Sequence, residues 1–183
     1  MIEADSIPQH LLNSARAEIS KHRNKLASLP GGSSEEGALS LGESFSVWTL
    51  QRGFEDGAND PRAFAQIGFW QQIYVAGRAS AFARLALADN DLALEMIGIV
   101  DVVPAIDTAI QWLDDNVSAD CVVRLLIVPF AHAHLFWLHG PENQIVPIDR
   151  PLGTLQPLAL YSLAEFFAAA TEARRHVSAD RIG

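Results

Sequence analysis

The first hydrophobic positions of the chain recur at the spacing of one helical face, mostly three or four residues apart: Ile7, Leu11, Ala15, Ile19 and Leu26. We therefore expect a helix over residues 7–29, with the basic run KHRNK (21–25) near its end, where positive charge suits the helix dipole. A stripe this narrow stabilises a helix only when it is buried. We expect a host for it in the chain's own body, in a second copy or in another protein, bound through Ile7, Leu11, Ala15 and Ile19.

The next stretch breaks the helical pattern. Residues 30–43 read PGGSSEEGALSLGE, a composition rich in glycine, serine and glutamate that is typical of a flexible linker. The sequence thus predicts three parts, namely an amphipathic helix over 1–29, a linker over 30–43 and a single domain over 44–183. We expect that domain to fold on its own.

Within residues 44–183 the hydrophobic pattern is mostly that of strands. SFSVWTLQ (44–51) alternates between two faces, and IGFWQQIYV and ASAFARLALA are further strand-like runs. LALEMIGIVDVV fits either a strand or a helix, and we favour the strand. PAIDTAIQWLDDN (104–116) instead has helical spacing, with Pro104 in the first turn, where proline is tolerated. After it, CVVRLLIVP, AHAHLFWLHG and QIVPID again resemble strands, and a helix is expected over 157–176.

The order of these elements indicates the fold class. Strands and helices are segregated along the chain rather than strictly alternating, which favours an α+β fold over a parallel α/β fold. We expect a largely antiparallel sheet of about six or seven strands, packed by the central helix over 104–116 and by the C-terminal helix.

Composition narrows the partners. The chain has 183 residues with 22 acidic against 13 basic side chains and a formal net charge of −9, so nothing in its overall charge attracts nucleic acid or anionic lipid. No apolar run reaches the roughly 18 residues that a membrane span requires. One cysteine excludes an intramolecular disulfide and the N-terminus does not resemble a signal peptide, so we expect a cytoplasmic protein.

Candidate chemistry gathers in PFAHAHLFWLHG (129–140), which holds three of the six histidines. On a strand, His132 and His134 would share one face about 6.6 Å apart and could converge on a metal ion. No third ligand follows at a diagnostic spacing, so we favour neutral imidazoles hydrogen-bonded inside the fold. A triad of Cys121, a histidine and Asp149 is a further alternative, but Cys121 begins an apolar strand, which favours a packing role.

No GxSxG, GxGxxG or P-loop motif is present. The leading hypothesis is therefore a cytoplasmic, non-enzymatic protein–protein interaction module, an adaptor or assembly subunit without a cofactor. It would dock through its N-terminal helix or a sheet edge onto a protein partner or a second copy, as a possible homo-oligomer. The alternative is a metal-dependent, hydrolase-like enzyme that uses a strand-borne His132–His134 site.

Overall fold

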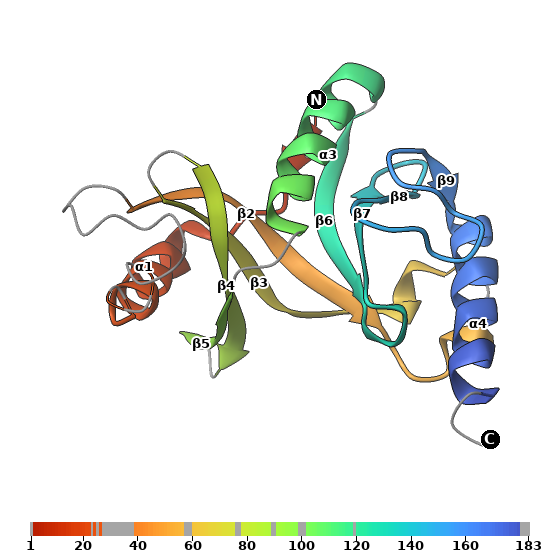
Figure 1. Cartoon of the computed structure of the whole chain (residues 1–183), viewed down its shortest axis with the longest axis horizontal. Helices are drawn as coiled ribbons and strands as arrows, with labels where there is room; N and C mark the ends of the chain where they lie inside the picture. The colour runs from red at the N-terminus through yellow and green to blue at the C-terminus, as the bar shows by residue number, and fades with distance from the viewer. Residues whose placement is uncertain are drawn as a thin grey trace.

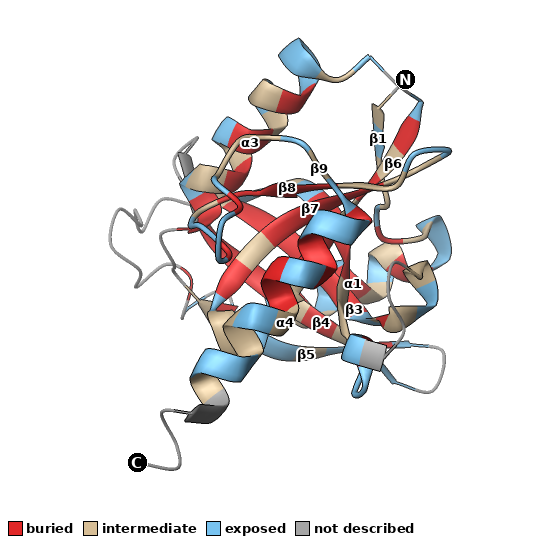
Figure 2. Ribbon diagram, turned by 90° about the vertical axis from the view of Figure 1, so that its right-hand side faces the viewer, coloured by how far each residue is buried: buried red, intermediate tan, exposed pale blue. Residues whose placement is uncertain are grey.

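One curved sheet organises the molecule, with helices on both of its faces (Figure 1). The computed structural model describes residues 2–22, 24, 26, 39–56, 60–75, 78–88, 91–98, 102–118 and 120–179. Buried residues follow the middle of the sheet and the inner sides of the helices (Figure 2). No helix within this described part is long and apolar enough to cross a membrane.

The strands follow one path, in the order β5 (Asp91–Gly98), β4 (Arg78–Ala88), β3 (Phe64–Val75), β2 (Leu39–Leu50), β6 (Cys121–Val128), β7 (Ala133–His139), β8 (Gln144–Pro147) and β9 (Tyr161–Ser162). The remaining strand, β1 (Ile2–Ala4), pairs with β6. All pairs are antiparallel except those of β1 and β2 with β6. This confirms the predicted α+β fold and its largely antiparallel sheet. The sheet has nine strands rather than six or seven, because β1 and β9, of three and two residues, are too short to leave a periodic signal.

Strands β1 and β2 share one edge of β6. β1 pairs with the start of β6, at Cys121 to Val123, and β2 pairs with its later part, at Leu125 to Ile127. Asp5 lies where one strand gives way to the other. Its N–H donates to the carbonyl of Val123 at 2.9 Å, and its own carbonyl accepts from the N–H of Ser46 in β2. The N-terminus is therefore part of the sheet.

The N-terminal helix packs on the same chain. A 3-10 turn η1 (Gln9–Leu11) precedes α1 (Leu12–Ser20), so the α-helix begins later than residue 7. Its stripe is buried against β3, β4 and β5 in two clusters: Ile7, Leu11 and Ala15 with Phe69, Leu85 and Leu92, and Ile19 and Leu26 with Ile73, Ala81, Ala83 and Ile97. Of the three hosts that the sequence allowed, the structure shows the chain's own sheet.

The predicted linker ends earlier than expected. β2 begins at Leu39, so residues 39–43 belong to the sheet and the boundary predicted at Ser44 falls inside a strand. Residues 27–38, which contain the rest of that linker and the end of the predicted helix, lie outside the described residues. Gly42 and Glu43, which the composition assigns to the linker, lie instead at a β-bulge of β2, between Leu41 and Ser44.

The other two helices cover separate parts of the sheet. α3 (Val102–Asn116) agrees with the helix predicted over 104–116. It buries Val103, Ile106 and Leu113 in one cluster with side chains of β2, β3, β4, β6 and β7. α4 (Leu163–Ala179) packs on the opposite face and begins six residues later than predicted. Its start is fixed by a capping box, because Ser162 N–H donates to the carboxylate of Glu165 while Glu165 N–H donates to Ser162 Oγ.

Burial of the N-terminal stripe makes a first prediction. Leu11→Ala removes a side chain that is 6% exposed, so the free energy of unfolding is expected to fall by about 2–5 kcal/mol. Arg16→Ala, on the exposed side of the same helix, is the control and is expected to change it by less than about 0.5 kcal/mol. Urea denaturation measures both. Equal effects of the two variants would show that the stripe does not complete the core.

Candidate functional site

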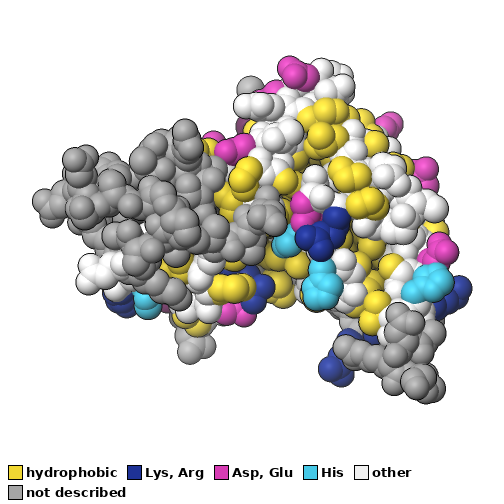
Figure 3. All heavy atoms as spheres, viewed as in Figure 1, with side chains coloured by type: hydrophobic (Ala, Val, Ile, Leu, Met, Phe, Trp, Pro, Cys, Tyr) yellow, Lys and Arg dark blue, Asp and Glu magenta, His cyan; other side chains and the backbone are white. Residues whose placement is uncertain are grey.

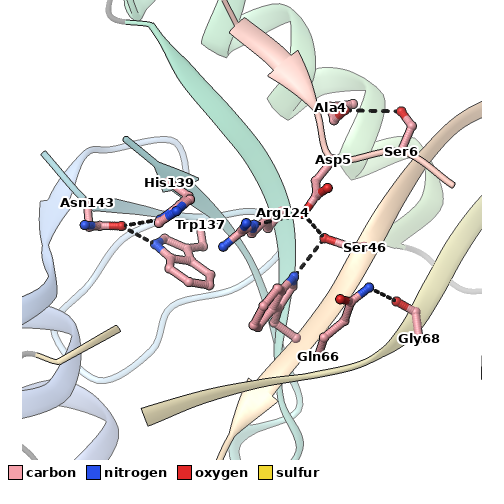
Figure 4. Close-up of polar contacts among 11 residues, drawn as sticks. Ala4, Asp5, Ser6, Ser46, Gln66, Gly68, Arg124, Trp137, His139 and Asn143 are labelled. Carbon is pink, nitrogen blue, oxygen red and sulfur yellow. Dashed lines mark hydrogen bonds and ion pairs between the residues drawn. The ribbon is translucent and has the colours of Figure 1, made fainter. Parts of the chain in front are cut away.

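Arg124 is the centre of a polar and aromatic cluster on the sheet face opposite α3 (Figure 4). Its neighbours in β6, Val123 and Leu125, are buried in the core beneath α3, so strand alternation directs Arg124 to the other face. The guanidinium carbon lies 4.6 Å from the ring centroid of Trp48 and 4.7 Å from that of Trp137. Both distances are within the range of a cation–π interaction.

Hydrogen bonds hold this arrangement from both sides. Arg124 Nε donates to Asp5 Oδ2 at 2.8 Å, and Ser46 Oγ donates to the same oxygen at 2.7 Å while accepting from Trp48 Nε1 at 2.8 Å. On the other side, Trp137 Nε1 donates to Asn143 Oδ1 at 3.0 Å.

The same Asn143 oxygen lies 2.9 Å from His139 Nδ1. The Arg124 side chain is 18% exposed and Asp5 is 32% exposed, so the centre of the cluster reaches solvent. The cluster is therefore a partly exposed surface whose side chains are held by hydrogen bonds, and these bonds leave none of its groups poised for proton transfer.

One residue in the sequence indicates this cluster, although the hydrophobic pattern around it predicts only a buried strand. Arg124 is the only charged residue in the strand CVVRLLIV, and a charge inside an apolar strand needs a partner. That partner, Asp5, is 119 positions away, and no local spacing connects the two.

A second cluster lies on the α3 face, where Figure 3 shows histidine, arginine and acidic side chains gathered among hydrophobic ones. His134 contacts Asp149 twice, through its backbone N–H at 3.2 Å from Oδ1 and through Nδ1 at 3.3 Å from Oδ2. Arg150 Nε donates to Asp149 Oδ2 at 3.2 Å. The imidazole also lies edge-on to Trp70, with 6.3 Å between ring centroids.

The environment of Asp149 favours its charged form. Burial of this side chain, which is 9% exposed, opposes ionisation, but the hydrogen bonds and charge of His134, together with Arg150, outweigh burial and lower the pKa of Asp149. An ionised carboxylate beside Nδ1 favours the tautomer with a proton on Nδ1. In the neutral ring, Nε2 of His134 is then the nitrogen that can accept a hydrogen bond.

The geometry predicted for His132 and His134 is wrong in one respect. Pro129 begins a 3-10 turn over 129–131, and His132 ends it with a left-handed φ of 50°, so the strand begins only at Ala133. The two histidines are therefore not an alternating pair on one strand. Among the described residues no group of three His, Cys, Asp or Glu side chains could hold a metal ion. A metal site at His132 and His134 stays a prediction.

Cys121 does not join the His134–Asp149 pair. His134 pairs with Ile127, six residues along β6 from Cys121, which corresponds to roughly 20 Å along a strand. Burial raises the pKa of the Cys121 thiol, which disfavours the reactive thiolate. The packing role expected for this cysteine fits both observations.

Comparisons with known proteins add no family. The chain matches no protein-family model, no curated protein and no solved structure. What the molecule does must therefore be inferred from the two clusters and the surfaces around them.

The Arg124 cluster makes a second prediction. Arg124→Ala leaves Asp5 without its cation and two tryptophan rings without their packing partner, so unfolding is expected to require about 2–3 kcal/mol less. Arg84→Ala is the matched control, since Arg84 makes two hydrogen bonds to a Glu95 side chain that is 46% exposed. Such a surface pair contributes about 0–1 kcal/mol. Chemical denaturation measures both variants. A loss of stability with Arg124→Ala no greater than with Arg84→Ala would contradict a stabilising role of the Arg124 cluster.

The His134–Asp149 pair makes a third prediction, on pH. Because the pKa of Asp149 is lowered on folding, its ionisation stabilises the fold above the pKa of the unfolded chain, about 4, and that contribution is lost as the pH falls through the folded value. Asp149→Asn should therefore be less stable than the wild type at pH 7, by about 1–3 kcal/mol. The difference should narrow below about pH 4. A difference independent of pH, measured by denaturation at several pH values, would contradict this assignment.

Proposed function

We propose that this protein is a non-enzymatic protein–protein interaction module, an adaptor or assembly subunit, whose partner binds the sheet face around Trp48 and Arg124. The observation that supports this most is an arginine that reaches solvent, with a side chain 18% exposed, held between two tryptophan rings. Tryptophan and arginine are among the residues that most often dominate the binding energy of protein interfaces.

Rigidity supports the proposal further. Side chains that are already fixed lose little conformational entropy when a partner binds. Asp5 and Ser46 hold Arg124 and Trp48, and Asn143 holds Trp137 from the other side. These groups would enter a complex in the orientation that they already have.

Neighbouring strands extend this surface. Gln66 of β3 is exposed and pairs with Trp48, while Val122 of β6 is half-buried and pairs with His139 of β7. Strand alternation places all of them on the face of Arg124. We name this surface the Trp48 face and define it by Trp48, Gln66, Val122, Arg124 and His139. It combines an aromatic and cationic centre with a polar rim, as many protein interfaces do.

The two routes expected from the sequence have less support than this face. The apolar stripe of α1 is already buried on β3, β4 and β5. The edge strand β5 has a β-bulge at Glu95, and the Glu95 carboxylate forms an ion pair with Arg84 of β4. A bulge and charged side chains are features that blunt a sheet edge against further pairing. We therefore propose docking through a face rather than through the helix or an edge.

A pair of matched variants tests the proposal. Gln66→Arg places a long charged side chain on the Trp48 face, whereas Gln111→Arg makes the same change on the exposed side of α3, on the other face of the sheet. Both positions are exposed, so both variants should keep the wild-type melting temperature within a few degrees. Affinity capture from cells of the source organism, with light scattering for self-association, compares their partners with those of the wild type.

We expect a protein, or a second copy of the chain, that is retained by the wild type and by Gln111→Arg but lost with Gln66→Arg. Equal retention by both variants would show that the Trp48 face is not the interface. Failure of the wild type to retain any specific protein or to self-associate would contradict the interaction module itself.

A further inference from the structure

A cavity of about 210 Å³ lies beside the second half of α3, between that helix and strands β1, β2 and β6. Cavities of roughly 150 Å³ with apolar walls already hold a molecule the size of benzene. Six of the eight residues that line it are hydrophobic, namely Ile2, Ala4, Phe45, Val123, Ile110 and Leu113. The space therefore suits a short hydrocarbon chain.

Two carboxylates complete the wall from different elements. Glu43 comes from β2 and Asp114 from α3. Both residues are exposed, and in the part of the chain that the structure describes neither carboxylate has an ion-pair or hydrogen-bond partner. Among the residues that line the cavity, two carry negative charge and none carries positive charge.

Rigid elements hold both charged positions. Gln71 is 3% exposed and its Nε2 donates to the carbonyls of Gly42 at 2.8 Å and Glu43 at 3.3 Å, which fixes the bulged segment that carries the Glu43 side chain. Asp114 follows Leu113, which is 2% exposed and anchors this turn of α3 in the core. The distance between the two carboxylate positions is therefore set by the packing of α3 on the sheet.

We infer that this cavity binds a primary ammonium group on a short hydrocarbon chain, with the chain against the apolar wall and the ammonium between Glu43 and Asp114. An anion would be repelled by the two carboxylates and by a net charge of −9. A neutral ligand would displace water from the two carboxylates without supplying a positive charge to offset the cost of that desolvation. The ligand is either a free alkylamine or the lysine side chain of another protein, which presents the same chemistry.

This inference does not rest on the interaction module, because the cavity and the Trp48 face lie on opposite faces of the sheet. Its test uses the full chain and backbone amide NMR shifts, with n-hexylammonium chloride as the probe. We expect saturable shifts at Ile110, Leu113 and Val123. 1-Hexanol and hexanoate, of the same length without the cation, should bind at least about tenfold more weakly.

Matched variants locate the charge. Glu43→Gln and Asp114→Asn should each weaken hexylammonium binding about tenfold, whereas Glu3→Gln and Asp115→Asn, exposed neighbours that do not line the cavity, should leave it unchanged. All four positions are exposed, so folding should be retained and a thermal melt checks it.

A second titration, with Nα-acetyl-lysine methylamide, separates the two sources of the ammonium group. Saturable binding of this compound at the same residues identifies a lysine side chain, and binding of hexylammonium alone identifies a free amine. No saturable shift with either amine, equal binding of 1-hexanol, or equal weakening by the control variants would overturn the inference.

Discussion

The joint at Asp5 is the interaction on which the other features depend. Two strands, β1 and β2, pair in succession with one edge of β6, and the ladder of backbone hydrogen bonds must pass from one to the other. Asp5 bridges that change with its backbone N–H and carbonyl, and its carboxylate accepts from Arg124 and Ser46. A carboxylate removed in part from water requires such partners, so Asp5 and Arg124 fix each other's positions.

Both proposed surfaces follow from this joint. Arg124, held by Asp5, lies between Trp48 and Trp137 and thereby gives the Trp48 face its rigid centre. On the other side of the sheet, the side chains of Ile2 and Ala4 in β1 form part of the cavity beside α3. Directly after Asp5, Ile7 and Leu11 pack against Phe69 of β3 and Leu85 of β4. The Asp5–Arg124 ion pair thus connects the N-terminus, the Trp48 face and the cavity.

The sequence predicted those parts of the fold whose signal is local. The apolar run of β6 and the helical spacing of α3 are visible in a short stretch of sequence, and the apolar stripe of α1 indicates a surface that must be buried. The parts that were missed depend on distant partners. Three residues of β1 have no period of their own, and Arg124 meets Asp5 only because the sheet brings them together. His132 was misplaced because the turn begun by Pro129 interrupts a run whose composition resembles a strand.

Native-state amide hydrogen exchange tests the joint most directly, because it reports whether the N-terminus opens separately from the sheet. The N–H of Asp5 donates to Val123 and the N–H of Ser46 donates to Asp5. If the joint is integral to the sheet, both amides should exchange as slowly as those of Leu125 and Phe136 in the centre of β6 and β7, through global unfolding alone. Rapid exchange at Asp5 with slow exchange at Leu125 and Phe136 would show a tethered N-terminus that opens on its own, and would contradict the role given to Asp5 and Arg124.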